Sequence, residues 1–409
     1  MRFYFIGLLA SVTILATAQN APTALSTMQQ VMNLDARTSY TAVRLQTPWD
    51  SLTTLKVRRD QSMTGANAVL VLSPIEKQGE LSVDNGRSWV QFFPDRGVLV
   101  VQDSPLKRRT QADINARFEL LKRNYRITLD KAESIAGRNT QRLAIIPAQK
   151  PFLYSRRFWI DTQKYVVLRV EWLDAFGKSK IVSDTINISY PNSFPPETFE
   201  VRIGTSPREI QVQAPVRQPG LNYLSRKVGF RVTHPSRMPF GFFLTGADSL
   251  TANNRALAAL RYTDGATNVT IYQAKVNQQN PPWTPSRTRG DFEMDGVLIA
   301  VEGDLPVQGR DQILQALREN DAKSEAILRD QAAKMLKVPT DVIVTLRGYG
   351  FGYEEVIGAV LSAYPGTRNL SRSVSILKQG KSVPELARLS NVPIADVKKT
   401  IEKFWATRQ

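Results

Sequence analysis

The strongest constraint on the fold of this chain is a long series of short segments in which apolar and polar residues alternate with a period of two. They run from about residue 39 to residue 190, and residues 52–59 (LTTLKVRR) are a clear example. Side chains of a β-strand point alternately to the two faces of a sheet, so this period predicts half-buried strands. Asp84-Asn85-Gly86 lies between two of them and is typical of a tight hairpin turn, because Asn-Gly tolerates positive φ angles. We therefore expect a large, mostly antiparallel sheet.

Two segments of this region have a helical rather than a strand pattern. Residues 112–124 place Ile114, Phe118 and Leu121 at helical spacing, and residues 29–32 belong to a second helix near the N-terminus. Both helices are expected to cover the sheet. This combination is the α+β fold class.

Composition divides the rest of the chain. A stretch rich in Pro and Ser at residues 191–219 predicts a linker and a domain boundary. Strand patterns then return, at residues 228–232, 240–244 and 267–275, and helix-forming residues predominate after residue 309. We expect a sheet domain over residues 19–204, a smaller α+β domain over residues 205–308 and an all-α C-terminal extension over residues 309–409.

The first residues predict export. In residues 1–18 (MRFYFIGLLASVTILATA), one charge at Arg2 precedes an apolar run, and Ala16-Thr17-Ala18 has the small-x-small pattern of a cleavage site. The run is short for a membrane span of about 20 residues, so a cleaved signal peptide is favoured over an uncleaved anchor. The mature protein is expected to be periplasmic or secreted, with cleavage near Ala18.

Composition argues against catalysis. The chain has no cysteine and one histidine, His234, which excludes thiolate nucleophiles, disulfides, cysteine-based zinc sites and iron–sulfur clusters. A Ser-His-Asp triad would have to use His234, which precedes a proline and has no Gly-x-Ser-x-Gly motif to accompany it. Paired carboxylates such as Glu354 and Glu355 show no sign of converging in a cleft. We expect a binding protein that is not an enzyme and needs no cofactor and no metal.

The charge balance indicates an anionic partner. The chain has 54 Lys and Arg residues against 37 Asp and Glu residues, a formal charge of +17. A cluster near the predicted helix is a candidate partner-binding basic patch for an acidic protein or an anionic lipid, with a solvated helix face as the alternative. Its members are Lys107, Arg108, Arg109, Arg117, Lys122 and Arg123.

The C-terminal end leaves an alternative open. Residues 383–390 and 394–404 have the pattern of two short helices joined by a turn at Asn391-Val392-Pro393, a spacing similar to a helix-turn-helix. In an exported chain they would form a protein-contact module or a structural cap. If residues 1–18 were not a signal, the same features would favour a basic DNA-binding protein.

Several short motifs follow one another in a fixed order. They are LSP (72–74), DNG (84–86), WVQFFP (89–94), IAGR (135–138), FWID (158–161) and, further on, LRYTDG (260–265). Together they resemble the sheet domain of the periplasmic lipoprotein carriers with the LolA-like fold, and both domains of the RseB/MucB sigma-factor regulators. The helical region after about residue 309 is not part of that pattern.

The resemblance implies a curved half-barrel that wraps around helices and encloses an apolar cavity for an acyl chain or a lipoprotein. It also implies contact with an acidic, membrane-anchored anti-sigma factor in envelope-stress signalling; a lipid or lipoprotein carrier without that role is the alternative. The candidate ligand-binding residues are Leu70, Leu72, Trp89, Phe92, Trp159 and Trp172. Their assignment to the cavity side depends on the strand register, because a shift of one residue moves each side chain to the other face of the sheet.

Overall fold

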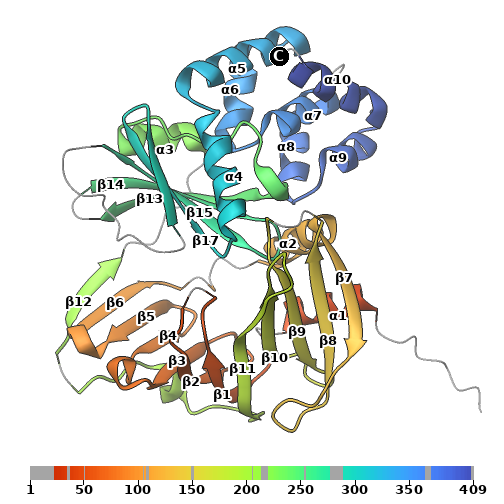
Figure 1. The fold of residues 1–409 in the computed structure, drawn as a ribbon. Coiled ribbons are helices and arrows are strands. Elements are labelled where there is room, and N and C mark those ends of the chain that lie inside the picture. Colours follow the sequence, from red (N-terminus) through yellow and green to blue (C-terminus); the bar gives the residue numbers. More distant parts are fainter. Residues whose placement is uncertain are drawn as a thin grey trace, which may run out of the picture.

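The computed structural model (Figure 1) consists of a large sheet with two helices, a smaller sheet with two helices, and a run of six helices. The predicted α+β class, with a large, mostly antiparallel sheet, is confirmed. The structure describes residues 23–34, 37–49, 51–104, 106, 110–148, 152–204, 206–212, 220–252, 255–276, 289–363 and 370–406.

The first sheet has 12 strands in the order β12-β6-β5-β4-β3-β2-β1-β11-β10-β9-β8-β7. All neighbours pair antiparallel except β12 and β6, which are parallel. The strands are β1 (Tyr40–Gln46), β2 (Leu55–Gln61), β3 (Asn67–Ser73), β4 (Leu81–Asp84), β5 (Ser88–Phe93), β6 (Val98–Asp103), β7 (Tyr125–Lys131), β8 (Thr140–Pro147), β9 (Ser155–Asp161), β10 (Val167–Leu173), β11 (Ser179–Ser189) and β12 (Arg208–Val212). β12 joins this sheet although it follows residue 204, the predicted end of the domain.

Two helices, α1 (Ala24–Leu34) and α2 (Gln111–Asn124), contact the end of the sheet formed by β7 and β8 (Figure 1). A capping box begins α2: the Thr110 hydroxyl accepts from the Asp113 N–H, and the Asp113 carboxylate accepts from the Thr110 N–H. Leu121 of α2 is buried in one cluster with Leu143 and Ile145 of β8. The expected helices over the sheet are therefore present.

The second sheet has the order β13-β14-β15-β17-β16 and packs against α3 and α4. Its elements are α3 (Leu221–Val228), β13 (Phe243–Ala252), β14 (Arg255–Thr263), β15 (Asn268–Lys275), β16 (Arg289–Met294), β17 (Val297–Gly303) and α4 (Val307–Arg318). The predicted strand at residues 228–232 is wrong: α3 ends at Val228, and Gly229 closes it at φ +76°. At residues 240–244 a 3-10 turn, Pro239–Gly241, precedes β13 instead of a strand through its full length.

The six remaining helices, residues 322–406, are called the helical module below. They are α5 (Ala322–Leu336), α6 (Thr340–Gly348), α7 (Tyr353–Ala363), α8 (Leu370–Lys378), α9 (Val383–Leu389) and α10 (Ile394–Ala406). None of the helices in the described part of the chain is long and apolar enough to span a bilayer.

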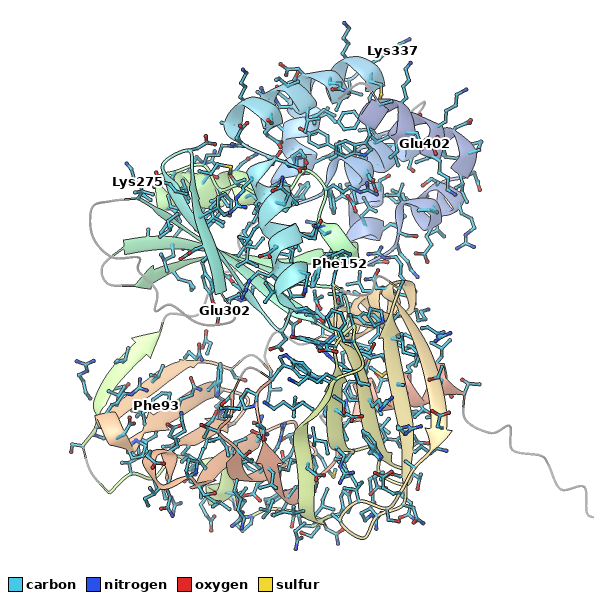
Figure 2. The ribbon with its side chains drawn as sticks, viewed as in Figure 1. Phe93, Phe152, Lys275, Glu302, Lys337 and Glu402 are labelled. Atoms are coloured by element: carbon cyan, nitrogen blue, oxygen red, sulfur yellow. The ribbon has the colours of Figure 1, made fainter. Side chains whose placement is uncertain are left out.

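The helical module uses the same helix ending twice. After α5, Lys337 (labelled in Figure 2) adopts φ +54° and the Val338 N–H donates to the Ala333 carbonyl. After α9, Asn391 adopts φ +54° and the Val392 N–H donates to the Ala387 carbonyl. A residue with positive φ that closes the last turn is a common helix ending. In both places a Val-Pro pair follows and directs the chain into the next helix.

A buried polar network joins the helical module to the second domain. Arg347 of α6 forms a bidentate pair with Glu325 of α5, at 3.0 and 2.8 Å, and also donates to the carbonyl of Pro235. Its Nη1 lies 3.4 Å from Nδ1 of His234, whose ring is buried. Burial, and then the charge of Arg347, hold the pKa of His234 well below its ordinary value.

Neutral His234 makes the stability of this joint dependent on pH. The unfolded chain gains a proton on His234 as the pH falls below about 6.5, whereas the folded chain does not, so stability decreases as the pH falls. Between pH 6.5 and 5.5 this group alone lowers the free energy of unfolding by about 1 kcal/mol. We expect the Tm of the wild type to fall more over this interval than that of His234→Gln, as measured by calorimetry. Parallel curves for the two proteins would contradict the assignment.

Candidate functional site

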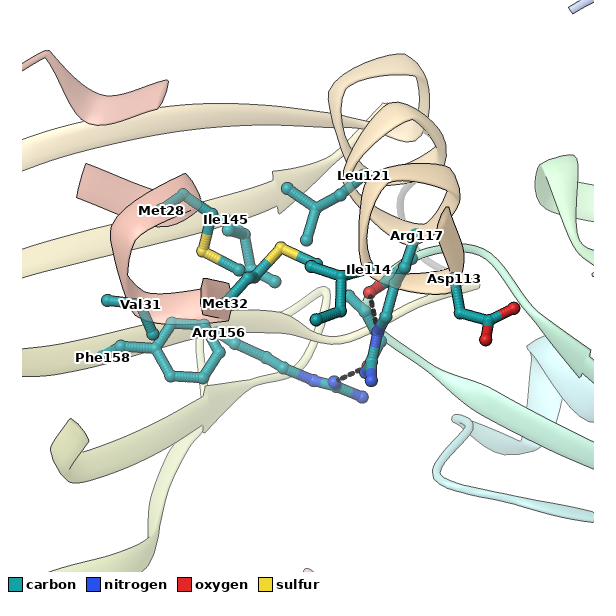
Figure 3. A pocket seen from close by; sticks show the side chains of 12 residues that line it. Met28, Val31, Met32, Asp113, Ile114, Arg117, Leu121, Ile145, Arg156 and Phe158 are labelled. Atoms are coloured by element: carbon teal, nitrogen blue, oxygen red, sulfur yellow. Dashed lines mark hydrogen bonds between the residues drawn. The ribbon is translucent and has the colours of Figure 1, made fainter. Parts of the chain in front are cut away.

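A cavity of about 390 Å³ lies between α1, α2, the first sheet and the turn between β14 and β15 (Figure 3). Most of its wall is apolar: Met28, Val31 and Met32 of α1, Ile114 and Leu121 of α2, Ile145 of β8 and Phe158 of β9. Asp113, Arg117 and Arg156 add charged groups, and Gly265 with Ala266 completes the wall. The volume is within the range of about 300–1,000 Å³ typical of small-ligand sites.

Arg156 of β9 is the most constrained charged group of this cavity. It is only 8% exposed, and its guanidinium lies 4.7 Å from the ring centroid of Trp172. Its two terminal nitrogens donate to the Ala266 carbonyl and to the Thr267 hydroxyl. Its Nε is buried and has no hydrogen-bond partner among the described residues. A buried donor without a partner is costly.

Residues 264–267, called the 264–267 turn below, dock the second domain onto the first. The Asp264 carboxylate accepts from the Tyr125 hydroxyl at 2.6 Å and from the N–H groups of Ala266 and Thr267. Burial raises the pKa of Asp264, although these donors oppose the rise. Burial and the adjacent Asp264 also raise the pKa of the Tyr125 phenol. The Asp264-Gly265 turn is therefore a joint between the two domains.

Of the six predicted ligand-binding residues, Trp172 lies next to the cavity. Its ring stacks with Tyr154 at 5.4 Å and with Trp49 at 6.4 Å, and Arg156 also lies over it. Trp159 faces the opposite side of β9. It packs in a separate buried cluster, whereas Phe158, its neighbour in the strand, lines the cavity.

The other four predicted residues lie on β3 and β5, away from the lining of this cavity. Leu70 pairs with Leu81, which pairs with Phe92, so these side chains form a row on one face of three strands. Leu72 lies two residues further along β3. Trp89 is three residues from Phe92 and thus on the other face of β5, where its indole N–H donates to the Ser82 hydroxyl at 2.7 Å. The structure does not bring the six residues into one site.

The basic residues of α2 contact neighbouring parts of the chain. Arg117 donates to the Gly265 carbonyl at 2.8 Å and Arg123 to the Gly241 carbonyl at 3.2 Å, both in the second domain. Lys122 pairs with Glu119 at 2.8 Å. The remaining members of the predicted patch, Lys107, Arg108 and Arg109, lie outside the described residues.

The sequence interpretation did not identify the residues that line the cavity from α1, nor Arg156. Met28, Val31 and Met32 have the i, i+3, i+4 spacing of one helix face, a signal that was available. Arg156 lies in a strand beside Arg157, and nothing in the sequence distinguishes the two. In the structure Arg157 pairs with Glu171 at 3.0 Å and is 39% exposed, whereas Arg156 is buried at the domain joint.

The cavity between the sheet and the helices over one end of it is the candidate site of this domain. Residues 22–185 match the family model described as the MucB/RseB N-terminal domain. This part of the chain is therefore a MucB/RseB N-terminal domain, which confirms the resemblance stated from its motifs. None of the curated proteins compared with the chain matches its sequence.

Solved structures of MucB are similar to this chain in fold. The complex of Pseudomonas aeruginosa MucA and MucB matches with 15% identity and a TM-score of 0.51, over 72% of this chain and 97% of that chain. A crystal structure of MucB matches with 16% identity and a TM-score of 0.46, over 72% and 96%. A structure of MucB in complex with MucA(peri) has 15% identity and a TM-score of 0.47, over 73% and 99%. More than a quarter of this chain lies outside each match.

The family match also bears on compartment and activity. MucB/RseB proteins are periplasmic regulatory binding proteins without enzymatic activity. Both properties agree with the predictions from the N-terminal residues and from the composition. The DNA-binding alternative required a chain that is not exported, whereas the matched family is periplasmic. In the structure, α9 and α10 bury Leu386 and Phe404 in the core of the helical module, and Val397 of α10 is also buried.

The 264–267 turn can be tested at its glycine. A Cβ on Gly265 would lie 2.5 Å from the Leu121 N and 2.9 Å from the Arg117 carbonyl oxygen, at φ +103°. Gly265→Ala combines backbone strain with a clash against α2, so we expect a loss of about 3 kcal/mol or more. Gly296→Ala is the control, because its φ is +70° but nothing lies within 4 Å of the added Cβ; we expect a loss of about 1 kcal/mol. Equal shifts in Tm would show that the close approach is unimportant.

Proposed function

We propose that this chain is a periplasmic regulator that binds an anionic ligand carrying an acyl chain and controls a membrane-anchored anti-sigma factor. It reaches the periplasm by means of residues 1–18, with cleavage near Ala18. The observation that carries the ligand half of this proposal is the buried guanidinium of Arg156 in the wall of a mostly apolar cavity.

The chemistry of the cavity favours an amphiphile. Its methionine, valine, isoleucine and phenylalanine side chains stabilise a hydrocarbon chain by removing it from water. The two methionines add unbranched side chains that adapt to ligands of different shape. An acidic group at the other end of the ligand would accept a charge-assisted hydrogen bond from Arg156. A lipid or the acylated end of a lipoprotein combines both features.

The partner half of the proposal rests on the family and on charge. The MucB structure from Pseudomonas aeruginosa is a complex with MucA. The present chain carries a formal charge of +17, which favours association with an acidic protein domain. Regulation of an anti-sigma factor is thus the role that the MucB/RseB domain supports. A carrier of lipids or lipoproteins without that role is the alternative.

The ligand can be tested with two probes of equal chain length. Dodecanoic acid and dodecanol differ only in the charged group that would meet Arg156, and a hydrogen bond to a charged group contributes about 1.5–3 kcal/mol. We therefore expect the wild type to bind the acid at least about tenfold more tightly in isothermal titration calorimetry.

A filled cavity provides the matching variant. Ile114→Trp places a larger side chain in the wall formed by α2 and is expected to abolish binding of both probes. Ile327→Trp, the same substitution at a 57% exposed position of α5, is the control and should bind like the wild type. Binding that survives Ile114→Trp would place the ligand elsewhere.

The partner can be tested by affinity capture. The immobilised mature protein, incubated with a detergent extract of cell envelopes, should retain an acidic protein with a single membrane span, and less of it as the salt concentration rises. Mass spectrometry identifies the retained proteins. Recovery of outer-membrane lipoproteins alone would support the carrier instead.

A further inference from the structure

Helix α2 is in contact with all three parts of the chain. One face lines the cavity with Ile114 and Leu121. The second domain contacts α2 through Gly265, which lies so close that a Cβ would meet the Leu121 backbone. The helical module contacts α2 through the turn between α8 and α9, residues 379–381, called the 379–381 turn below; in Figure 1 this end of the module lies directly above α2.

The contact between the 379–381 turn and α2 is close and partly ionic. Gly380 adopts φ +79°, and a Cβ there would lie 2.8 Å from the Ala116 carbonyl oxygen, so only glycine permits this approach. Next to it, the Lys381 ammonium lies 3.4 Å from the Glu119 carboxylate, where both side chains are largely buried (29% and 25% exposed). Ala116 and Glu119 are three residues apart and therefore lie on one face of α2.

The helical module is itself fixed to the second domain, so the 379–381 turn cannot move away freely. The Tyr353 N–H donates to the Ser236 carbonyl at 2.9 Å, and Arg347 donates to the Pro235 carbonyl. Gly350 approaches Leu244 so closely that a Cβ would clash with that side chain. Arg347 also holds Glu325 of α5. A displacement of α2 toward the turn must therefore deform packed contacts.

These contacts hold α2 between two glycine backbones, Gly265 and Gly380, and the side of α2 that meets Gly265 also forms the wall of the cavity. A ligand that needs more room than the cavity offers has to displace this helix. This displacement presses α2 against the 379–381 turn, and the contact resists it because packed side chains and backbone do not deform gradually.

We propose that the helical module is a clamp on α2 that limits how far the cavity can widen and so sets the size of ligand that the protein accepts. This rests on the proposed function, because it assigns a regulatory contact to the same cavity. By linkage, a ligand that displaces α2 also weakens the hold of the module on the first domain. Cavity occupancy and the position of the helical module are then coupled.

The clamp is tested by reversing one charge. Lys381→Glu turns the attraction to Glu119 into repulsion, which separates the 379–381 turn from α2 and leaves the helix room to move. We expect it to tighten the binding of octadecanoic acid about fivefold, the lower end of typical coupling between sites. Binding of dodecanoic acid should stay within twofold, because the shorter chain needs no displacement of α2. The double variant Glu119→Lys/Lys381→Glu restores opposite charges between the turn and α2, but it places an ammonium beside Lys122 and a carboxylate beside Glu385. It should therefore return the affinity for the longer acid part of the way to that of the wild type.

A matched control lies in the same region. Lys378→Glu also reverses a lysine, but the Lys378 ammonium lies over the Tyr349 ring at 4.1 Å, within the helical module rather than on α2. We expect it to leave the preference between the two acids unchanged. Equal effects of Lys378→Glu and Lys381→Glu, or no effect of Lys381→Glu on the longer acid, would overturn the clamp.

Hydrogen exchange separates this proposal from the proposed ligand. Without any ligand, Lys381→Glu should raise amide exchange in α2 (Gln111–Asn124), whereas Lys378→Glu should not. If the wild type binds neither fatty acid but α2 responds in this way, the clamp stands and the proposed ligand fails. If α2 exchanges alike in the wild type and in Lys381→Glu, the clamp fails whatever the ligand is.

Discussion

The arrangement of this molecule depends on how the 264–267 turn enters the first domain. Asp264 brings a carboxylate into a buried site, which is costly unless its oxygens are hydrogen-bonded. Tyr125 and two backbone N–H groups supply those bonds, and Gly265 lets the turn approach the backbone of α2. The same turn forms part of the cavity wall and orients Arg156. Domain docking and the candidate ligand site thus depend on the same turn.

The second joint is built on the same physical basis. Between the second domain and the helical module, the Arg347–Glu325 pair and the neutral ring of His234 are buried among apolar residues. Apolar contacts at both joints provide most of the attraction but little orientation, because the hydrophobic effect is not directional. Buried hydrogen bonds have a fixed geometry, and breaking one leaves a polar group without a partner. A few polar residues therefore determine how the three parts are oriented.

The sequence predicts helices and strands whose formation depends on the local pattern of residues. It does not predict the positions of side chains that are determined by contacts with distant parts of the chain. Alternation predicts most strands of the first sheet, and helical spacing predicts α2. The segment 228–232 alternates in the same way, but Gly229 closes a helix there and the pattern misleads. Trp159 and Trp172 are both strand tryptophans, yet they lie on different sides of the sheet. The arginines of α2 are visible as charge, but the carbonyls that Arg117 and Arg123 meet come from residues more than a hundred positions away.

The position of α2 explains why a binding domain of this kind would be extended by a helical module. A cavity in one domain can influence a partner elsewhere only if its occupancy changes an element that other parts contact. Helix α2 is such an element, since it lines the cavity and touches both the 264–267 turn and the 379–381 turn. A partner that contacts the second domain or the helical module therefore binds a surface whose position depends on the cavity. By reciprocity, the partner changes ligand affinity by the same factor as the ligand changes partner affinity.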